Sequence, residues 1–515
     1  MLAQILSATT FGIDAFIIKV EAHLEGAVPG FITVGLPDNA VRESKERVNA
    51  AIKNSGFTFP IKRITINLAP ADLRKEGSGF DLPIAVGILA AHGQIESHRT
   101  EEYVVVGELS LDGSLRPING VLSLALRARR EHIKGIIVPA GNAAEAAMAE
   151  GLEVIPVNAL SDAVQFLNGQ KHIAPHQVDM SALFDQAPAM PVDFRDVKGQ
   201  EHAKRALEIA AAGGHNIIMI GPPGSGKTML AKRIPTILPD LTPDEALETT
   251  KIHSVAGFLP QNTPLVTLRP FRSPHHTISD AGLIGGGHIP KPGEVSLAHH
   301  GVLFLDELPE FKKNVLEVMR QPLEDGHVTI SRAEMSLTYP ANFMLACAMN
   351  PCPCGFHTDP GNRCTCNPGM IQRYMAKISG PLLDRIDIHI DCPAIKYKEL
   401  SSEGHGETSS AIRERVKKAR QIQLKRFESL RKKGQPVYCN ADMESRAIRE
   451  FCTIDARSQE LMKLAITKLG LSARAYDRIL KVARTIADCA NAPAIRAEHV
   501  SEAIQYRSLD RSYSG

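Results

Sequence analysis

The feature that most constrains this chain is an eight-residue segment, GPPGSGKT, which runs from Gly221 to Thr228. It matches G-x-x-x-x-G-K-[ST] at every fixed position, and it lies between an apolar run, 216–220, and a segment, 229–234, that can continue as a helix. A strand, a glycine-rich turn and a helix in this order form a phosphate cradle, because glycine adopts the positive φ that turns successive N–H groups toward an anion. The segment therefore predicts a nucleotide-binding α/β core.

The residues of this segment have distinct expected roles. Lys227 reaches the β- and γ-phosphates of ATP, and the hydroxyl of Thr228 is a ligand of Mg²⁺. The alternative, a glycine turn beside a chance lysine, is disfavoured because a strand precedes the segment and a helix follows it. The expected phosphate-binding residues are Gly221, Pro222, Pro223, Gly224, Ser225, Gly226, Lys227 and Thr228.

Polar residues end two further apolar runs. The run 302–305 is followed by Asp306 and Glu307, and the predicted strand 342–348 leads to Asn350. Buried parallel strands deliver the residues at their carboxyl ends to the crevice where α/β proteins bind ligands. We expect Asp306 to hold Mg²⁺, Glu307 to polarise the attacking water, and Asn350 to orient that water or sense the γ-phosphate. The alternatives are that the acidic pair merely ends a strand and that the amide caps a turn.

Arginine and lysine residues suggest two more functions. Arg385, in LLDRID, is a candidate arginine finger that reaches the γ-phosphate of another subunit; the alternative is an ion pair with Asp384 or Asp387. The predicted helix 411–433 carries ten Lys or Arg residues, which indicates a solvated face or contact with a phosphate backbone.

Four of the nine cysteines lie within fifteen residues, in the pairs C-P-C and C-T-C. In an extended segment residues i and i+2 point the same way, so each pair can present two sulfurs to one ion. The number of thiols suits a structural zinc site, although the commoner spacing is C-x-x-C, and four reduced thiols without a metal are the alternative. The four cysteines are Cys352, Cys354, Cys364 and Cys366.

Two regions lie between these motifs: the first lacks regular periodicity, and the second has the pattern of a hairpin. We expect the stretch 239–294, rich in Gly, Pro and His, to be irregular, and we interpret its paired His275 and His276 as polar loop residues more than as metal ligands. Alternating apolar residues around 328–337 predict a β-hairpin with its turn at 332–334.

Length and charge set the organisation of the chain. Its 515 residues predict domains at 1–169, 191–395 and 396–515, with a linker at 170–190. The net charge of +2 excludes a chain that binds polyanions over its whole surface, so any nucleic-acid contact must be local. No apolar run is long enough to span a membrane. Cysteines without a small disulfide framework, in a chain with an ATP motif, predict a cytoplasmic location.

The first 169 residues mix strand and helix periodicities, which predicts an α/β or α+β unit. Two segments, 73–91 and 113–146, resemble the proteolytic domain of Lon proteases. In that alignment Gly79 stands where the nucleophilic serine belongs and Leu122 where the lysine belongs. A Ser–Lys dyad needs both groups, so we expect a non-proteolytic domain. Ser78 next to the expected position leaves an active protease as the alternative.

The order of the motifs resembles the Mg-chelatase-like AAA+ ATPases, and within them the ComM (YifB) family. The signatures include VGLPDNAVRESKERV, PHHTISDAGLIGGG, NPCPCG and SGPLLDRID, and the resemblance covers nearly the whole chain. It implies an α/β fold with a three-layer AAA+ P-loop core and a helical lid, preceded by the Lon-like domain. It also implies that Gly199 and Gln200 touch adenine and that Arg474, in LSARAYDRIL, contacts nucleotide from the lid.

The same resemblance implies a function. It implies that the chain forms a hexameric ring, which uses ATP and Mg²⁺ to drive DNA branch migration in recombination and natural transformation. The hairpin around Arg332 and the glycine-rich insertion before Val302 are then the elements that face DNA, single-stranded or branched, in the pore. The alternative is a remodelling ATPase or chelatase-type motor that acts on a protein partner.

Overall fold

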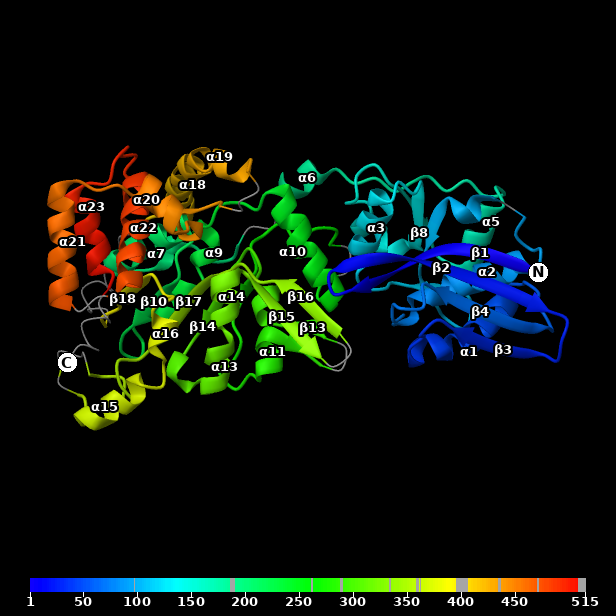
Figure 1. Cartoon of the computed structure of the whole chain (residues 1–515), viewed down its shortest axis with the longest axis horizontal. Helices are drawn as coiled ribbons and strands as arrows, with labels where there is room; N and C mark the ends of the chain where they lie inside the picture. Colours follow the sequence, from blue (N-terminus) through cyan, green and yellow to red (C-terminus); the bar gives the residue numbers. More distant parts are fainter. Residues whose placement is uncertain are drawn as a thin grey trace. The chain divides into compact units, whose positions relative to one another are not determined.

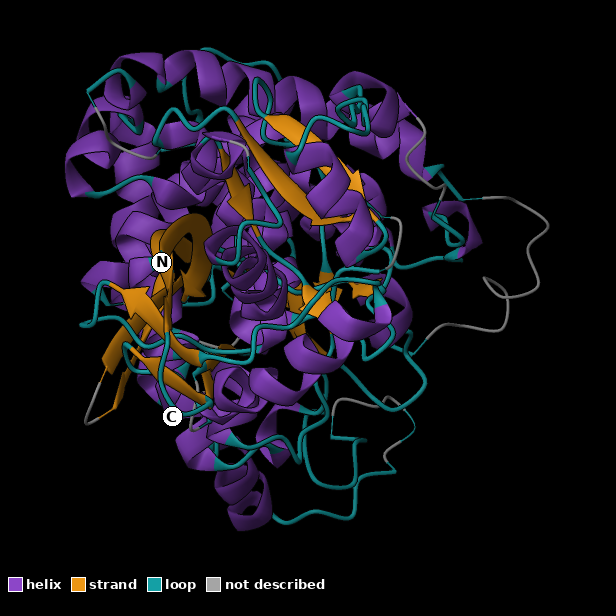
Figure 2. Ribbon diagram, turned by 90° about the vertical axis from the view of Figure 1, so that its right-hand side faces the viewer, coloured by secondary structure: helices purple, strands orange, loops and turns teal. Residues whose placement is uncertain are grey.

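The computed structural model describes residues 1–96, 98–185, 190–260, 263–287, 290–332, 335–357, 361, 363–394, 406–433, 437–469 and 472–507. The chain forms two compact units (Figure 1). The first comprises Met1–Ala187 and Thr242–Thr267, and the second comprises Pro188–Leu241 and Leu268–Gly515. Figure 2 shows that the described residues form both helices and strands; the elements that follow Asp391 are all helices. No helix in these described ranges is both long and apolar enough to cross a membrane.

The first unit is built on a seven-stranded mixed sheet with the order β3-β4-β2-β1-β5-β8-β9. Its strands are β1 Leu2–Phe11, β2 Asp14–Glu25, β3 Gly30–Val34, β4 Arg63–Ala69, β5 Tyr103–Val105, β8 Gly135–Pro139 and β9 Glu153–Val157, with a short pair, β6 Glu108–Leu109 and β7 Leu115–Arg116. Its helices are α1 Asn39–Asn54, α2 Asp81–Ala91, α3 Val121–Arg130, α4 Ala143–Ala146, α5 Leu160–Leu167, α6 Met180–Asp185 and α10 Pro243–Ala256.

Both faces of this sheet are buried around β5 and β8, whereas buried and more exposed residues alternate along β2 and β4. Along β8, Ile136 and Val138 belong to one hydrophobic cluster, whereas Ile137 belongs to another. Neighbouring residues of a strand point to opposite faces, so the two clusters cover the two sides of the sheet. Burial on both faces explains why the sequence shows continuous apolar runs here.

Helix α10 corrects one prediction, because the region 239–294 is not irregular throughout. Thr242 and Glu245 form a capping box, Pro243 occupies the first turn, and Gly257 caps the C-terminus at φ 77°. These are ordinary start and stop signals for a helix, and the abundance of Gly and Pro further along the chain obscured them.

A buried carboxyl group fixes α10 within the first unit. Glu145 accepts hydrogen bonds from the Ser254 hydroxyl on α10, from Asn142 Nδ2 at 3.3 Å and from the backbone N–H of Leu122 at 2.9 Å. The Ser254 hydroxyl in turn accepts from Gly120 N–H at 2.8 Å. Burial raises the pKa of Glu145, and these donors oppose the rise. The segment 242–267 therefore interrupts the second unit along the sequence, but it folds as part of the first unit.

The second unit contains a five-stranded parallel sheet with the order β11-β14-β17-β10-β18. Its strands are β11 Phe271–Arg272, β14 Val302–Leu305, β17 Met344–Met349, β10 Ile217–Ile220 and β18 Ile388–Asp391. Ile220 pairs with Met349, and Leu305 pairs with Cys347. This register brings the ends of β10, β14 and β17 to one edge of the sheet.

Helices cover this sheet and continue as a bundle at the C-terminus. They are α7 Glu201–Gly213, α8 Lys227–Ala231, α9 Ile234–Ile237, α11 Asp280–Ile284, α12 Glu294–Leu297, α13 Lys313–Val318, α14 Arg320–Asp325, α15 Pro368–Met375, α16 Gly380–Leu383, α18 Ser409–Arg426, α19 Glu428–Arg431, α20 Ser445–Phe451, α21 Ala456–Leu469, α22 Ala473–Cys489 and α23 Ala497–Gln505. One hydrophobic cluster contains residues of the sheet, of α7 and of α22, so the core and the helical lid share a continuous interior. Thr408 caps α18, because its side chain accepts a hydrogen bond from Ala411 N–H.

Two hairpins extend the second unit. The predicted hairpin is confirmed as β15 His327–Arg332 paired with β16 Met335–Pro340. A shorter one pairs β12 Gly285–Gly286 with β13 Lys291–Pro292. The Tyr339 hydroxyl donates to the carbonyl of Pro290 at 2.7 Å, so the two hairpins are in contact. Residues 333 and 334 of the predicted hairpin turn lie outside the described residues.

Candidate active site

The phosphate segment begins where β10 ends, inside the parallel sheet. Gly221 N–H donates to the carbonyl of Met349 at 3.2 Å, which continues the ladder between β10 and β17 for one residue. A Cβ atom on Gly221 would lie 2.0 Å from the carbonyl oxygen of Cys392. Glycine is therefore required at this position by close approach of the next strand's backbone. Gly224 and Gly226 have φ of 76° and 86°, which places both in the left-handed region that the predicted loop needs.

Lys227 is the buried cation of the site. Its Nζ donates to the carbonyls of Gly221 and Pro222 at 2.7 and 2.9 Å, and it lies 3.3 Å from Asn350 Oδ1. Burial lowers the pKa of this ammonium group. The chain thus holds a weakly solvated positive charge at the mouth of the loop, where a phosphate group can exchange for the carbonyl acceptors.

The second acidic motif lies directly beside the loop. Thr228 Oγ1 donates to Asp306 Oδ2 at 2.7 Å, although 77 residues separate the two in the sequence (306 − 228 − 1). A hydroxyl and a carboxylate oxygen are hard ligands of the kind that Mg²⁺ selects, so these two residues fit the expected ion. Glu307 follows in a left-handed conformation with φ 53°, uncommon for a residue with a side chain. Its side chain is 59% exposed, so solvent reaches the carboxylate.

The predicted adenine-contacting residues occupy a turn next to the loop. Gly199 and Gln200 have φ of 62° and 57°, and α7 begins immediately after them. The Gln200 amide donates to the carbonyl of Pro393 at 2.7 Å and to that of Ser225 at 3.3 Å. The turn is therefore tied both to the phosphate loop and to the end of β18.

The four cysteines of the C-P-C and C-T-C pairs converge, with all four sulfurs within 4.8 Å of one another. Cys352 Sγ lies 3.3 Å from Cys354 Sγ and 3.8 Å from Cys364 Sγ. Four thiolates around zinc, each about 2.3 Å from the metal, place their sulfurs about 3.8 Å apart, so the cluster fits this ion. Backbone N–H groups of Phe356 and Thr365 lower the pKa of Cys354 to about 5.

The cysteine cluster also lies against the phosphate loop. A Cβ atom on Gly355 would be 2.6 Å from Cδ of Pro223, and Gly355 has φ 85°. Gly355 N–H donates to the carbonyl of Cys352 at 2.9 Å. The loop that carries the thiols is therefore packed on the residues that precede Lys227.

The structure does not bring the two predicted arginines, Arg385 and Arg474, into contact with the phosphate-binding residues of the same chain. The Arg385 guanidinium is nearly buried and contacts the Glu324 carboxylate and the carbonyl of Pro381, not Asp384 or Asp387. Arg474 is exposed in the first turn of α22. Among the described residues, no hydrogen bond or ion pair joins either arginine to Lys227, Thr228 or Asp306 of the same chain.

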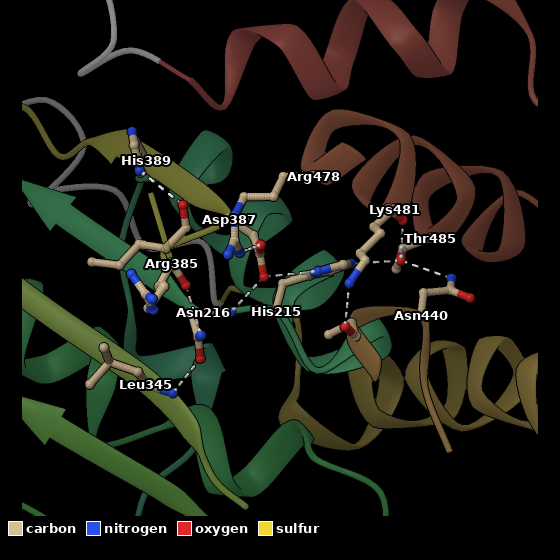
Figure 3. A network of polar contacts seen from close by, with 12 residues as sticks. His215, Asn216, Leu345, Arg385, Asp387, His389, Asn440, Arg478, Lys481 and Thr485 are labelled. Atoms are coloured by element: carbon tan, nitrogen blue, oxygen red, sulfur yellow. Dashed lines mark hydrogen bonds and ion pairs between the residues drawn. The ribbon is translucent and has the colours of Figure 1, made fainter. Parts of the chain in front are cut away.

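A buried polar network joins the sheet to the lid (Figure 3). Asp387 accepts from the Arg478 guanidinium of α22, from His215 Nδ1 at 3.3 Å and from Asn216 N–H at 3.3 Å. Burial raises the pKa of Asp387, but Arg478 and His215 lower it more, so the pKa lies well below its usual range. His215 Nε2 continues the network to Thr485 Oγ1 at 2.8 Å.

Asn216 extends this network toward Arg385. Its amide group donates to the carbonyl of Arg385 at 3.0 Å and accepts from Leu345 N–H at 2.8 Å (Figure 3). The sequence does not predict this network, because its members lie far apart along the chain. The available signals were an ionisable pair, Asp387 and His215, next to buried apolar strands.

Most arginines of the basic helix α18 bind within the second unit. Arg415 pairs with Glu208 and Glu407, Arg413 contacts Asp240, and Arg426 pairs with Asp488. Arg420 donates to the carbonyls of Ala211 and Ala212. These guanidinium groups are structural, which removes them from the cations that a phosphate backbone can contact.

The first unit holds no Ser–Lys pair at the positions where Lon proteases carry their dyad. Ser78 Oγ donates to the Glu108 carboxylate, and Leu122 is fully buried. The nearby Lys75 donates to the carbonyls of Pro70 and Leu73. A hydroxyl bound to a carboxylate, with the neighbouring lysine engaged elsewhere, has no arrangement for attack assisted by a lysine base.

Comparison with known proteins identifies relatives over the whole chain. Residues 193–400, 20–142 and 406–507 match the families described as magnesium chelatase subunit ChlI, subunit ChlI of Mg-chelatase, and magnesium chelatase subunit ChlI C-terminal. The chain is 45% identical to the competence protein ComM of Haemophilus influenzae over 513 residues, which covers 99% of this chain and 98% of that protein. It is 44% identical to the uncharacterized protein YifB of Escherichia coli over the same fractions of the two chains. It is 33% identical to Lon protease 2 of Bacillus subtilis over 164 residues, 28% of each chain.

Substitutions at the site should separate nucleotide binding from hydrolysis. Lys227→Ala removes the buried ammonium, so we expect the affinity for ATP to fall by at least about 100-fold. Glu307→Gln keeps the phosphate contacts, so it should bind ATP within about threefold of the wild type and lose hydrolysis by at least about 100-fold. Titration with a fluorescent ATP analogue and a phosphate-release assay measure the two effects.

The control for these variants is Lys232→Ala, which removes an exposed lysine five residues after Lys227. It should leave both binding and hydrolysis unchanged. Normal hydrolysis by Glu307→Gln would show that another group activates the water.

Proposed function

Because the chain belongs to the ComM (YifB) family of magnesium-chelatase-like AAA+ ATPases, we propose that it is an ATP-driven ring motor that acts on DNA. The observation that carries the proposal is the convergence of Lys227, Thr228, Asp306 and Asn350 at one edge of a parallel sheet. Phosphoryl transfer needs little covalent chemistry from the protein, so a site that positions groups and neutralises charge is sufficient.

Each residue has a defined part in this proposal. The backbone N–H groups of the phosphate loop and Lys227 bind the phosphates, and Thr228 and Asp306 hold Mg²⁺, which neutralises charge on the transferred phosphoryl group. Glu307 orients and deprotonates the attacking water. Asn350, which already lies 3.3 Å from Lys227 Nζ, senses the γ-phosphate.

Two arginines complete the proposed site, one donated by a neighbouring chain and one by the same chain. Arg385 contacts Glu324 within its own chain, and we assign it to the γ-phosphate of a neighbouring subunit in a ring, which the family resemblance implies is a hexamer. Arg474 is exposed at the start of α22 and is assigned to the nucleotide of its own chain.

DNA is the proposed substrate of the motor, in single-stranded or branched form. A relative of nearly the same length is named a competence protein, which supports a role in branch migration during recombination and natural transformation. The two contacting hairpins, β12–β13 and β15–β16, provide a surface at which a strand of DNA can bind, with Arg332 at the end of β15. The arginines of α18 are engaged internally, although Lys418 and Lys425 of that helix are exposed, and we assign the local DNA contact to the two hairpins.

Two further assignments complete the proposal. The first unit is a non-proteolytic Lon-like domain, since Ser78 is bound to Glu108 and Leu122 replaces the lysine. The nine cysteines of the chain all lie in the second unit, and no two of them form a disulfide, which supports a reducing cytoplasmic location for the chain. We also assign zinc to Cys352, Cys354, Cys364 and Cys366, where it would stabilise the loop that packs on Pro223.

The zinc assignment predicts the metal content of the purified protein. Elemental analysis should give about one zinc per chain, and Cys364→Ser should lower this to near zero because a three-thiolate site binds zinc more weakly. The control is Cys489→Ser, since Cys489 lies outside the cluster. Zinc well below one per chain in the wild type would favour four reduced thiols.

The substrate assignment predicts how hydrolysis responds to added polymers. At a fixed low salt concentration we expect single-stranded or forked DNA to raise ATP turnover by about fivefold or more, and we expect casein to have no effect and to stay intact. Stimulation by casein, or its cleavage, would instead favour a remodelling ATPase or an active protease. Turnover unchanged by every DNA would contradict a DNA motor.

A further inference from the structure

A pair of adjacent histidines in the second unit, His275 and His276, lies between β11 and α11 and contacts the hydrolytic side of the site. His276 Nδ1 is 3.3 Å from Glu307 Oε2, a hydrogen-bond distance when that nitrogen carries a proton. Among the described residues, His276 is the side chain that contacts the Glu307 carboxylate. The sequence predicts that both histidines are polar loop residues, whereas in the structure one of them contacts the predicted base.

The His276 ring is held in place from two sides. Its ring contacts that of His275 at a tilt of 34°, with the centroids 4.1 Å apart, and forms a T-shaped pair with Phe311, with the centroids 6.4 Å apart. His275 is itself fixed, since its Nδ1 is 2.9 Å from Thr277 Oγ1. The His276 side chain is 30% exposed, half the exposure of Glu307. A ring packed in this way is a fixed group against which a mobile carboxylate can be oriented.

Glu307 needs such a partner. Its backbone is held, because its N–H donates to Asp306 Oδ1 at 3.0 Å and its carbonyl accepts from Glu310 N–H at 2.8 Å. The side chain, however, has three rotatable bonds and more than half of its surface in solvent. A base that must meet one water molecule in line with the phosphate loses rate when its carboxylate samples several rotamers.

The segment that carries His276 continues into the proposed DNA-facing elements. Ser279 caps α11, and Asp280 in the first turn of that helix accepts from the Asn314 amide of α13 at 2.8 Å. The chain then forms β12 and β13, and the carbonyl of Pro290 before β13 accepts from Tyr339 on the hairpin β15–β16. A displacement of these hairpins therefore has a direct covalent path to His276.

We propose that His276 is the positioning residue for Glu307, and that it couples the occupancy of the two hairpins by DNA to ATP hydrolysis. The second half of this proposal rests on the proposed function, whereas the first half does not. In the proposed mechanism the imidazole N–H holds one carboxylate oxygen, which leaves the other to accept the proton of the water. DNA on the hairpins shifts the segment 275–287 and thereby selects the productive rotamer of Glu307.

The test compares His276→Ala and His276→Gln with the wild type in ATP hydrolysis, with and without single-stranded DNA. We expect His276→Ala to lower kcat by about tenfold or more, to leave the KM for ATP within about twofold, and to abolish stimulation by DNA. His276→Gln, whose amide keeps a donor, should recover a large part of kcat. The control His172→Ala, an exposed histidine of the first unit, should behave as the wild type.

The outcomes distinguish the two proposals. Wild-type turnover of His276→Ala, or equal loss in His276→Ala and His276→Gln together with weaker binding of ATP, would overturn the positioning role. If the wild type itself shows no response to DNA, the proposed function fails, and the kcat of the two variants without DNA still decides whether His276 positions Glu307. Loss of stimulation in His276→Ala, with stimulation retained in His276→Gln, supports the coupling.

Discussion

The site depends on one constraint, the parallel register of β14, β17 and β10. Parallel strands end at the same edge of a sheet, so residues placed after three separate strands meet without any local signal that they should. Gly221 continues β10 into the phosphate loop, Asp306 and Glu307 follow β14, and Asn350 follows β17. The close approach of Cys392 to Gly221 fixes the loop from the other neighbouring strand. Charge neutralisation at the loop is thus a consequence of strand order more than of any single contact.

The same sheet connects the nucleotide site to the lid. Asp387 stands just before β18, and its buried carboxylate is balanced by Arg478 on α22 and by His215 beside β10 (Figure 3). Buried charges of this kind are costly unless they are paired and hydrogen-bonded, so the network fixes one arrangement of lid and sheet. Asn216 then ties this network to the backbone of Arg385. The arginine assigned to a neighbour is therefore held on the most tightly organised part of its own subunit.

Local patterns predicted much of this structure. Gly221 to Thr228 and the strand before Asp306 follow from spacing and periodicity, and the structure brings Thr228 and Asp306 together. Helix α10 is not predicted, although Thr242 and Glu245 form the capping box at its start. The many Gly and Pro residues further along the chain favour an irregular segment and outweigh this short capping pattern. The contacts of Asp387 with Arg478 and of Arg385 with Glu324 were beyond prediction from one sequence, since they join elements that are distant along the chain. The contact of His276 with Glu307 is likewise not predicted, because the two residues are distant along the chain.

The most direct test of a shared catalytic centre is a mixing experiment. Arg385→Ala lacks the arginine assigned to the neighbour, and Glu307→Gln lacks the base, so each should be inactive alone. In mixed rings, a subunit with intact Glu307 can receive Arg385 from its neighbour, and roughly a quarter of the interfaces in an equal mixture are then complete. The account predicts that ATP turnover reappears on mixing, in proportion to that fraction. A mixture as inactive as either variant alone would contradict it.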